Sequence, residues 1–543
     1  MNTQTITEID HRALSELITR VEYAIEHELA LSVDDMKLLL SAITTLCTLQ
    51  VKIEQDDITL HKLRKLLGMI KQSEKRDKKC SESKNKKNGR VKKPRVKKTK
   101  LTTTPQVVHH HLLEHHKGDI CPACARGKLY KYDPGKLLRI TGHARFEAIQ
   151  HIVEQLRCNA CEQVYKAPLP ESVLVDGDEG QQYGYSARTL MAMDKFFTGI
   201  PYYHQSTLAG LFGFSISAST IFDQCEYVAN DVMPVFYELR RRAADATKLM
   251  LDDTKHRILT QEPEWRDKPN GKGKQLRTGV YCSGLIATLA DGHEVILFET
   301  SLGHAGEYLA QILEKRTPNL SPPIVMNDAS SSNGVVKINI ISCYCNAHAR
   351  RQFYDLEKIY PKDIGWVLDT YGNIWGNEDH IQEERMDDAA RLKYHKEHSL
   401  PAMQSIYEWA INKRNSKVFE EHSAYGKAIN YFINHYDKLR MFCVVEGALI
   451  DNNRMEEKLK IPIRGRKTAH FFKTPNGAGI ANVLISLFAT TAQAKENVYE
   501  YFLALQKNRD KVKANPSAWL PWNFREMLAL ENSNQQSEKI NSS

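Results

Sequence analysis

Apolar residues recur at every seventh position in the N-terminal part of the chain. The repeat extends over more than four heptads, at Leu39, Leu46, Ile53, Leu60 and Leu67. Most residues three places further on are apolar as well. Such a repeat predicts a coiled coil, although one helix of a compact bundle gives a similar pattern. We therefore expect residues 10–70 to be helical and to associate with other helices in either arrangement.

From residue 247 the apolar pattern changes to the shorter period of β-strands. Three consecutive strands are predicted, with an Asp-Gly turn at Asp291 between the last two. A helix, an apolar strand, a further strand and a second helix follow. In chain order the segments are 247–259, 277–292, 293–302, 305–315, 322–333, 336–345 and 346–356. This order of elements predicts an RNase H-like sheet within an α/β domain.

Helical patterns fill much of the remaining chain. Residues 184–240 contain a stretch with helix-turn-helix spacing, in which a turn at Gly213 precedes a helix that starts near Ser217. Ordinary helical packing explains this stretch equally well, so both interpretations stay open. Residues 360–440 are predicted to form a charged helical insertion in the sheet domain. The helices from about residue 453 onward are expected to return to the sheet.

The charge of the chain is concentrated in one segment. The 543 residues are 42 % hydrophobic and 26 % charged, which supplies enough apolar material for several domains. The formal net charge is +9, but residues 71–100 hold 15 Lys and Arg against 3 Asp and Glu, a local +12 that leaves −3 elsewhere. Residues 72–105 are therefore predicted to be a disordered basic linker that binds phosphates, or else a solubilising tether.

The sequence contains no predicted membrane segment. No apolar run approaches the roughly 18 residues needed to cross a bilayer, and the N-terminus lacks the apolar core of a secretory signal. We therefore expect a cytoplasmic, nucleoid-associated protein without a membrane partner. In that reducing compartment the 11 cysteines are expected to be thiols or metal ligands.

Four of these cysteines form two CxxC pairs, Cys121 with Cys124 and Cys158 with Cys161. Four thiolates are the ligand set of a tetrahedral structural Zn²⁺. Redox chemistry of the thioredoxin type is disfavoured because two pairs occur and neither lies in a βαβ context. The sequence therefore predicts a zinc-binding module.

Three acids lie at the ends of predicted elements. Asp252 follows the apolar residues of the first strand, Asp328 ends a later strand, and Glu456 lies just inside a helix. Phosphodiester chemistry with two Mg²⁺ (or Mn²⁺) ions needs about three carboxylates. The three residues are therefore candidate metal ligands and catalytic groups.

Each acid also has a purely structural interpretation. The two aspartates suit strand-end turns, and Asn453 with Glu456 forms a passable capping box. Spacing alone does not choose between Asp252 and Asp253, or between Glu456 and Glu457.

Four stretches of the chain resemble transposases of the insertion sequence 66 family. They are the paired CxxC knuckles, "LDDT" at 251–254, "CNAHARRQF" at 345–353, and "DNNRMEEK" at 451–458 followed by "GRKTAHFF". The resemblance implies a DDE triad on an RNase H-like fold, with Asp252, Asp328 and Glu456 as the triad. The family usually has Asp-Glu-Thr where this chain has Asp-Asp-Thr, and tends toward glycine and tyrosine where "ASSSN" follows Asp328.

The resemblance implies a DNA transposase that cleaves the 3′ ends of its element and transfers them to target DNA. Its partners would be the terminal repeats and target DNA, a second protomer or a higher oligomer, and small accessory proteins. The alternative is a catalytically inactive, zinc-dependent DNA-binding protein, either a degenerate transposase or a regulator. A metal-dependent nuclease of the same fold is a third interpretation.

Basic residues near the acids and in the linker are predicted to contact DNA. Guanidinium groups suit phosphate oxygens because they donate paired hydrogen bonds. Arg350 and Arg351, which follow the strand predicted at 336–345, could instead lie on a solvated helix face. The predicted contacts are Arg350 and Arg351, then Arg464, Arg466 and Lys467 after the helix of Glu456, and in the linker Lys92, Lys93, Arg95, Lys97 and Lys98.

The predicted fold class is a multidomain α/β protein with an RNase H-like catalytic core. Its parts are a helical coiled-coil segment (1–71), a basic disordered linker (72–105), a zinc-binding module (106–170), a helical DNA-binding or linking region (171–245), an RNase H-like DDE catalytic domain (246–500) with a helical insertion at about 360–440, and a C-terminal helix and tail (501–543).

Overall fold

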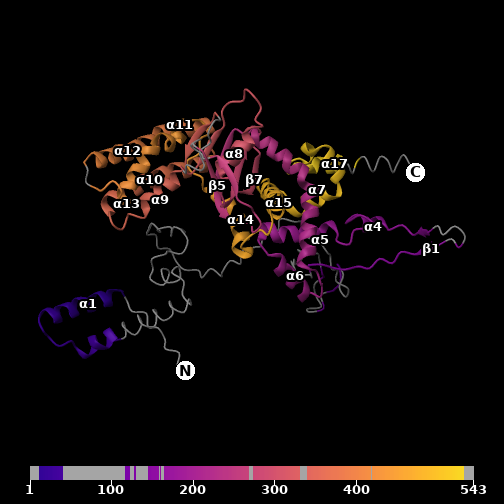
Figure 1. Cartoon of the computed structure of the whole chain (residues 1–543), viewed down its shortest axis with the longest axis horizontal. Helices are drawn as coiled ribbons and strands as arrows, with labels where there is room; N and C mark the ends of the chain where they lie inside the picture. The colour runs from indigo at the N-terminus through magenta and orange to yellow at the C-terminus, as the bar shows by residue number, and fades with distance from the viewer. Residues whose placement is uncertain are drawn as a thin grey trace. The chain divides into compact units, whose positions relative to one another are not determined.

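The computed structural model divides into two compact units, residues 1–135 and 136–543 (Figure 1). It describes residues 11–40, 145–157, 164–267, 273–329, 339–416 and 419–530, with isolated residues between 117 and 160 and residue 533. The heptad repeat beyond Leu40, the linker at 72–105 and the four cysteines of the CxxC pairs lie outside the described residues.

The N-terminal unit begins with helix α1 (His11–Glu26), after which the chain turns. Glu28 has a φ of 52°, and a second helical segment runs from residue 33 through Leu40. Ser32 caps this segment because its Oγ accepts a hydrogen bond from the Asp35 N–H at 3.1 Å. A salt bridge of 2.8 Å joins Arg20 to Asp35 across the turn. The prediction of an uninterrupted helix over 10–70 is therefore wrong at residues 27–32.

A five-stranded mixed sheet forms the centre of the second unit (Figure 1). Its strand order is β7-β6-β3-β8-β9. The first three strands are antiparallel neighbours, and β8 and β9 continue the sheet in parallel with β3. All five strands were predicted from the apolar pattern: β3 (Lys248–His256), β6 (Val280–Thr288), β7 (Glu294–Ser301), β8 (Ile324–Asn327) and β9 (Ile341–Tyr344).

Helices cover both faces and one edge of the sheet. Helix α8 (Ala305–Leu313) packs on β3 and β6, and helix α14 (Asn453–Ala469) packs on the same strands. A side chain at Gly284 of β6 would collide with Met455 of α14, so the glycine permits this close approach. Helix α15 (Pro475–Gln493) lies along the edge strand β7.

The helices predicted over 360–440 are present and have an apolar core of their own. Phe353, Tyr371 and Phe432 are fully buried in it. These helices pack together beside the sheet (Figure 1). They are α10 (Pro361–Glu383), α11 (Asp388–His398), α12 (Leu400–Asn415) and α13 (Ala424–Leu439), packed with α9 (Asn346–Tyr354).

The helix-turn-helix stretch has the predicted secondary structure. Helix α6 (Tyr202–Leu211) leads to Gly213, which has a φ of 85°, and Ser217 caps helix α7 (Ala218–Ala244) by accepting from the Thr220 N–H. Gly213 permits this turn because a left-handed φ favours glycine. Before α6, helix α5 (Tyr185–Met193) continues into a π-helix, η1 (Asp194–Thr198), which was not predicted.

Several short elements complete the described structure. Antiparallel strands β1 and β2 flank the second CxxC pair, and a β4–β5 hairpin that was not predicted precedes β6. None of the described helices has the length and apolar character that crossing a bilayer requires. These elements are β1 (Gln155–Arg157), β2 (Val164–Lys166), α4 (Glu171–Leu174), β4 (Glu264–Asp267), β5 (Lys274–Arg277), η3 (Met441–Cys443), α16 (Val498–Lys507), α17 (Arg509–Ala514) and η4 (Pro516–Trp519).

Candidate functional site

The three predicted acids come from three elements that meet at the sheet. Asp252 lies in β3, Asp328 directly follows the neighbouring parallel strand β8, and Glu456 lies in the first turn of α14. Burial, and to a lesser extent the negative charges of Asp328, Asp253 and Glu456, raises the pKa of Asp252 to about 7. A hydrogen bond of 2.8 Å from the Asp253 N–H opposes this shift. Asp328 and Glu456 are therefore each close enough to repel the charge of Asp252.

Asp253 has different surroundings from Asp252 because successive strand residues point to opposite faces of a sheet. Its Oδ2 lies 2.9 Å from Nδ1 of His304, the residue that precedes helix α8, and 3.4 Å from the Ala305 N–H. The carboxylate of Asp253 therefore caps the start of α8. His304 was not predicted as its partner, because a contact over 51 positions has no sequence signal.

Glu456 lies beside His348 of helix α9. The Glu456 Oε1 and His348 Nδ1 atoms are 3.7 Å apart. Both atoms are buried, and neither has a hydrogen-bond partner in the described part of the chain. Glu457, one position further along α14, is exposed. Glu456 and Glu457 therefore have different surroundings, as Asp252 and Asp253 do.

Tertiary contacts fix the start of α14. Asn452 is fully buried, and its side-chain amide donates to the Leu251 carbonyl at 3.0 Å, next to Asp252. The Asn452 N–H donates to the Cys345 sulfur at 3.2 Å. These bonds connect the helix of Glu456 to β3 and to the residue after β9. Asn452 was not predicted to have this positioning role.

The predicted capping box at the start of α14 is wrong. Asp451 accepts the Asn453 N–H at 3.1 Å, and Trp375 of the insertion donates to the same carboxylate at 3.3 Å. The Glu456 N–H bonds within the helix, to the Asn452 carbonyl at 3.2 Å. An aspartate two residues earlier therefore takes the capping role predicted for Asn453.

Among the described residues, no group of three or more His, Cys, Asp or Glu side chains is placed to hold a metal ion. The donors of the acid site nevertheless fit a divalent cation in kind. Carboxylate oxygens are the ligands that Mg²⁺ prefers, and Glu456 Oε1 is buried without a partner. A cation would also relieve the repulsion that raises the pKa of Asp252.

The cysteines near the site are core residues. Cys343 and Cys345 are buried, and burial raises the pKa of both thiols to about 12. Thiols held neutral in this way are poor metal ligands.

The basic residues near the acids have varied surroundings. Arg350 lies over the ring of Tyr354 at 5.6 Å, and Arg351 is exposed. The run that was predicted to follow the helix of Glu456 lies within it, because α14 continues through Pro462. In that run Arg464 donates to the Phe197 carbonyl at 2.9 Å, Arg466 donates to Thr254 Oγ1 at 3.1 Å and to the Lys255 carbonyl, and Lys467 is exposed. The five linker residues from Lys92 to Lys98 lie outside the described residues.

Comparison with known proteins gives one family and two relatives. The sequence model described as "Transposase IS66 family" matches residues 180–480, which is more than half of the chain and includes all three acids. The chain is 24 % identical over 414 residues to "Uncharacterized protein y4hP" of Sinorhizobium fredii, an alignment that covers 71 % of this chain and 69 % of that protein. It is also 24 % identical over 190 residues to "Uncharacterized protein y4jD" of the same organism, covering 34 % and 36 %.

Proposed function

Because this chain belongs to the IS66 transposase family, we propose that it cleaves the ends of its own DNA element and joins them to target DNA. The observation that supports the proposal is the proximity of Asp328 and Glu456 to Asp252, whose pKa is raised to about 7 by burial and, to a lesser extent, by these negative charges. We assign these three residues as the catalytic acids.

The sheet supports an RNase H-like interpretation of the catalytic domain. Three antiparallel strands are followed by two strands parallel to the first, in the order β7-β6-β3-β8-β9. The acids lie on β3, at the carboxyl end of β8 and on a helix that crosses β3. Ligand sites of α/β sheets form at the carboxyl ends of parallel strands, which agrees with this placement of Asp328.

The three acids would hold two Mg²⁺ or Mn²⁺ ions. When bound, such ions lower the pKa of the attacking water or 3′-hydroxyl and stabilise the leaving oxygen. His348 lies 3.7 Å from Glu456 and would orient that carboxylate. Asn452 would fix the distance between α14 and Asp252 by its bond to the Leu251 carbonyl. No covalent intermediate with the protein is required.

DNA is the partner that the basic residues support. Arg350, Arg351, Arg464 and Lys467 are candidate phosphate contacts near the acids, and the linker would add a sequence-independent attraction. Arg466 is bound to Thr254 and the Lys255 carbonyl, so we assign it a structural contribution as well. The N-terminal helices would pair protomers so that two element ends meet. We expect this complex in the cytoplasm on the nucleoid, with or without accessory proteins.

A zinc module at 106–170 remains part of the proposal. Residues 120 and 128 pair in antiparallel fashion around the first CxxC pair, and β1 and β2 pair around the second. Short hairpins of this kind present two thiolates at a turn. Removing zinc with a strong chelator should expose residues 106–170 to proteolysis, since such modules fold with their metal. Full protection of this region after zinc removal would contradict the assignment.

Cleavage and joining assays test the catalytic assignment. The substrate is a duplex that carries the inverted repeats found beside the coding sequence, with Mg²⁺ present. Asp252→Asn, Asp328→Asn and Glu456→Gln should each abolish both reactions, whereas the matched neighbours Asp253→Asn and Glu457→Gln should retain them. DNA binding by the wild-type protein without any cleavage would instead favour the inactive DNA-binding protein. The reverse pattern among the variants would move the site to Asp253 and Glu457.

A further inference from the structure

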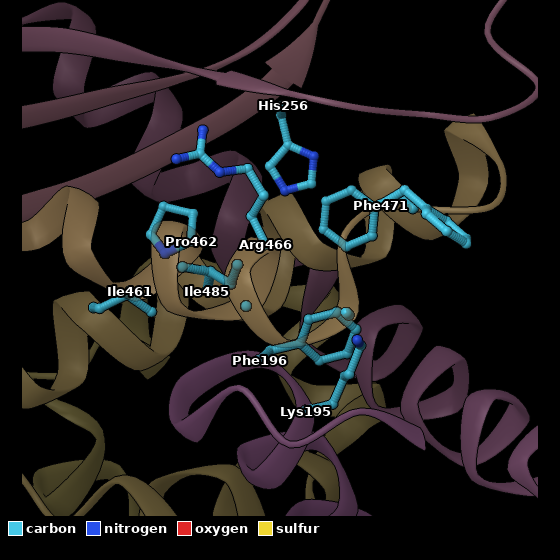
Figure 2. A pocket seen from close by; sticks show the side chains of 11 residues that line it. Lys195, Phe196, His256, Ile461, Pro462, Arg466, Phe471 and Ile485 are labelled. Atoms are coloured by element: carbon cyan, nitrogen blue, oxygen red, sulfur yellow. The ribbon is translucent and has the colours of Figure 1, made fainter. Parts of the chain in front are cut away.

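A narrow pocket with about 20 Å³ of accessible space lies where the end of α14 meets the end of β3 and the π-helix η1. Figure 2 shows Lys195 on one side of this pocket and His256 and Arg466 on the other, with Phe471 beside them. No aspartate or glutamate is among the residues that line it. The pocket therefore combines basic side chains with apolar walls.

Lys195 is a buried cation without a counter-ion. The residue is only 8 % exposed, and within the described part of the chain no carboxylate or hydrogen-bond acceptor pairs with its ammonium. Its Nζ lies 4.9 Å from the centre of the Tyr202 ring, whose face attracts it weakly. The adjacent Asp194 is bound to Arg145 instead. Burying an ammonium in this way opposes folding, so the free protein gains no stability from its charge.

The local backbone holds Lys195 toward α14. The π-helix η1 ends at Gly199, which has a φ of 84°. Thr468 of α14 donates to the Gly199 carbonyl at 2.5 Å, and Arg464 donates to the Phe197 carbonyl at 2.9 Å. A π-turn inserted into a helix is a feature that often marks functional positions. The pocket is thus held together by hydrogen bonds between η1 and α14.

The positive charges of the pocket act on one another. Burial, together with the charges of Arg466 and Lys195, lowers the pKa of His256 to about 4. Burial likewise lowers the pKa of Lys195 to about 8. His256 is therefore uncharged near neutral pH, and Lys195 and Arg466 are the cations among the described lining residues. Cations in a hollow whose lining holds no acid attract an anion.

We propose that this pocket receives one oxygen of a DNA phosphate at its mouth, with the Lys195 ammonium as the main ligand of that oxygen. Residues 252, 254 and 256 share one face of β3, so the pocket lies four residues, or roughly 13 Å, along the strand from Asp252. A DNA strand whose reacting phosphate lies at the acids would place a nearby phosphate there. This inference deepens the proposed function and depends on it for the path of the DNA.

Chemical protection of Lys195 tests the proposal without any catalysis. The full-length protein is treated with an amine-acetylating reagent in EDTA, and modification of Lys195 is measured by mass spectrometry. The arms contain no addition, inorganic phosphate, or a duplex oligonucleotide at low salt. We expect the duplex to abolish labelling of Lys195, whether or not the inorganic phosphate of the other arm also protects it. Binding of the duplex with Lys195 still labelled would overturn the proposal, and protection by inorganic phosphate alone would assign the pocket to a free anion.

Variants of Lys195 distinguish an anion ligand from a packing residue. Lys195→Met keeps the shape of the stem and removes the charge, so it should raise the melting temperature of the free protein. It should also lower DNA affinity and reduce the salt dependence of binding by about one phosphate contact. Lys195→Arg should restore the salt dependence, and Lys513→Met on α17 is the matched control. A lower melting temperature for Lys195→Met with unchanged DNA affinity would show that the lysine is structural.

Because cleavage cannot occur in EDTA, these measurements do not depend on the assignment of the acids. Loss of protection at Lys195 alone would remove the phosphate pocket and leave the catalytic proposal intact. If the acid variants kept cleavage and joining while DNA still protected Lys195, the catalytic assignment would be wrong and the phosphate pocket would stand.

Discussion

Asp252 and Asp253 show how adjacent residues of one type acquire different chemistry. Burial, and to a lesser extent the nearby acids, makes the ionisation of Asp252 costly in free energy. Asp253 has a histidine at 2.9 Å and the start of a helix beside it, which stabilise its charge. Strand alternation creates this difference, because it directs one side chain toward α14 and the other toward α8. An acid held in mutual repulsion is the better candidate for a cation ligand.

A first prediction concerns pH and Mg²⁺. The folded-state pKa of Asp252, about 7, lies above the unfolded value near 3.8, so ionised Asp252 destabilises the fold. The free energy of unfolding should fall as pH rises from about 4 through about 7, and Mg²⁺ should restore it. Melting temperatures with Mg²⁺ and with EDTA should therefore differ more at about pH 8 than at about pH 5.

The neighbouring glutamates of α14 provide the control for this experiment. Glu456→Gln should lose most of the Mg²⁺-dependent rise in melting temperature at the higher pH. Glu457→Gln should keep it, because Glu457 is exposed. Equal responses of the two variants would show that Glu456 does not contribute to a cation site.

At the scale of elements, helix α15 protects an edge of the sheet. Strand β7 is the first in the sheet order, so one row of its backbone groups has no strand partner. Three polar side chains, spaced four residues apart on α15, accept hydrogen bonds from the N–H groups of that row. Asn482, Ser486 and Thr490 accept the N–H groups of Thr300, Phe298 and Ile296 at 2.9, 2.8 and 3.0 Å. These bonds explain the buried polar residues of an otherwise apolar helix.

A second prediction tests this contact between helix and strand. Ser486→Ala should leave the buried Phe298 N–H unpaired and lower the free energy of unfolding by about 1–3 kcal/mol, measured by urea denaturation. Thr491→Val is the matched control, since the Thr491 hydroxyl bonds only to the Leu487 carbonyl of its own helix. A loss in the control as large as in Ser486→Ala would argue against edge protection.

A third prediction concerns the insertion. Burial raises the pKa of Glu378, but the His395 hydrogen bond and the Arg391 charge outweigh it and lower the value to about 2. Because the folded pKa is below the unfolded value near 4.5, this stabilisation is present above about pH 4.5 and is lost as pH falls toward 2. Glu378→Gln should remove roughly 3 kcal/mol of it, whereas Glu383→Gln, exposed on the same helix, should not. Urea denaturation at about pH 5 and about pH 3 measures both, and parallel pH profiles would contradict the prediction.

The same comparison of elements shows what the sequence could predict. Buried strands and long amphipathic helices have a strong period, so the five strands and the insertion were predicted in the correct order, although the segments predicted for β8 and β9 are longer than these strands. The β4–β5 hairpin has no buried face, as the exposed Trp265 and Leu276 show, and so lacks that period. The turn after α1 is joined by the salt bridge of Arg20 to Asp35, and the capping carboxylate of Asp451 accepts from the distant Trp375. The roles of His304, Asn452 and Lys195 have the same origin and were missed for the same reason.

At the scale of the whole molecule, charge and chemistry occupy different parts of the chain. The acids and the residues around them lie in the second unit, within the region matched by the family. Residues 71–100 carry a local +12, while the remainder carries −3. The catalytic region, residues 246–500, holds 33 Lys and Arg against 32 Asp and Glu, and a net charge this close to zero gives DNA little long-range attraction. The basic segment is therefore expected to supply most of the sequence-independent affinity.

A fourth prediction separates this affinity from catalysis. Replacing Lys92, Lys93, Arg95, Lys97 and Lys98 with glutamine should reduce the slope of log affinity against log salt by about 4, if all five contact phosphates. The melting temperature should stay unchanged, because a segment with the composition predicted for a linker contributes little to a fold. Fluorescence anisotropy with a labelled duplex over a salt series measures the slope. In a control variant, lysine is replaced by arginine and arginine by lysine at the same five positions. This variant keeps the charge and should keep the slope. An unchanged slope in the glutamine variant would show that the segment is only a tether, and DNA affinity would then have to come from the catalytic unit itself.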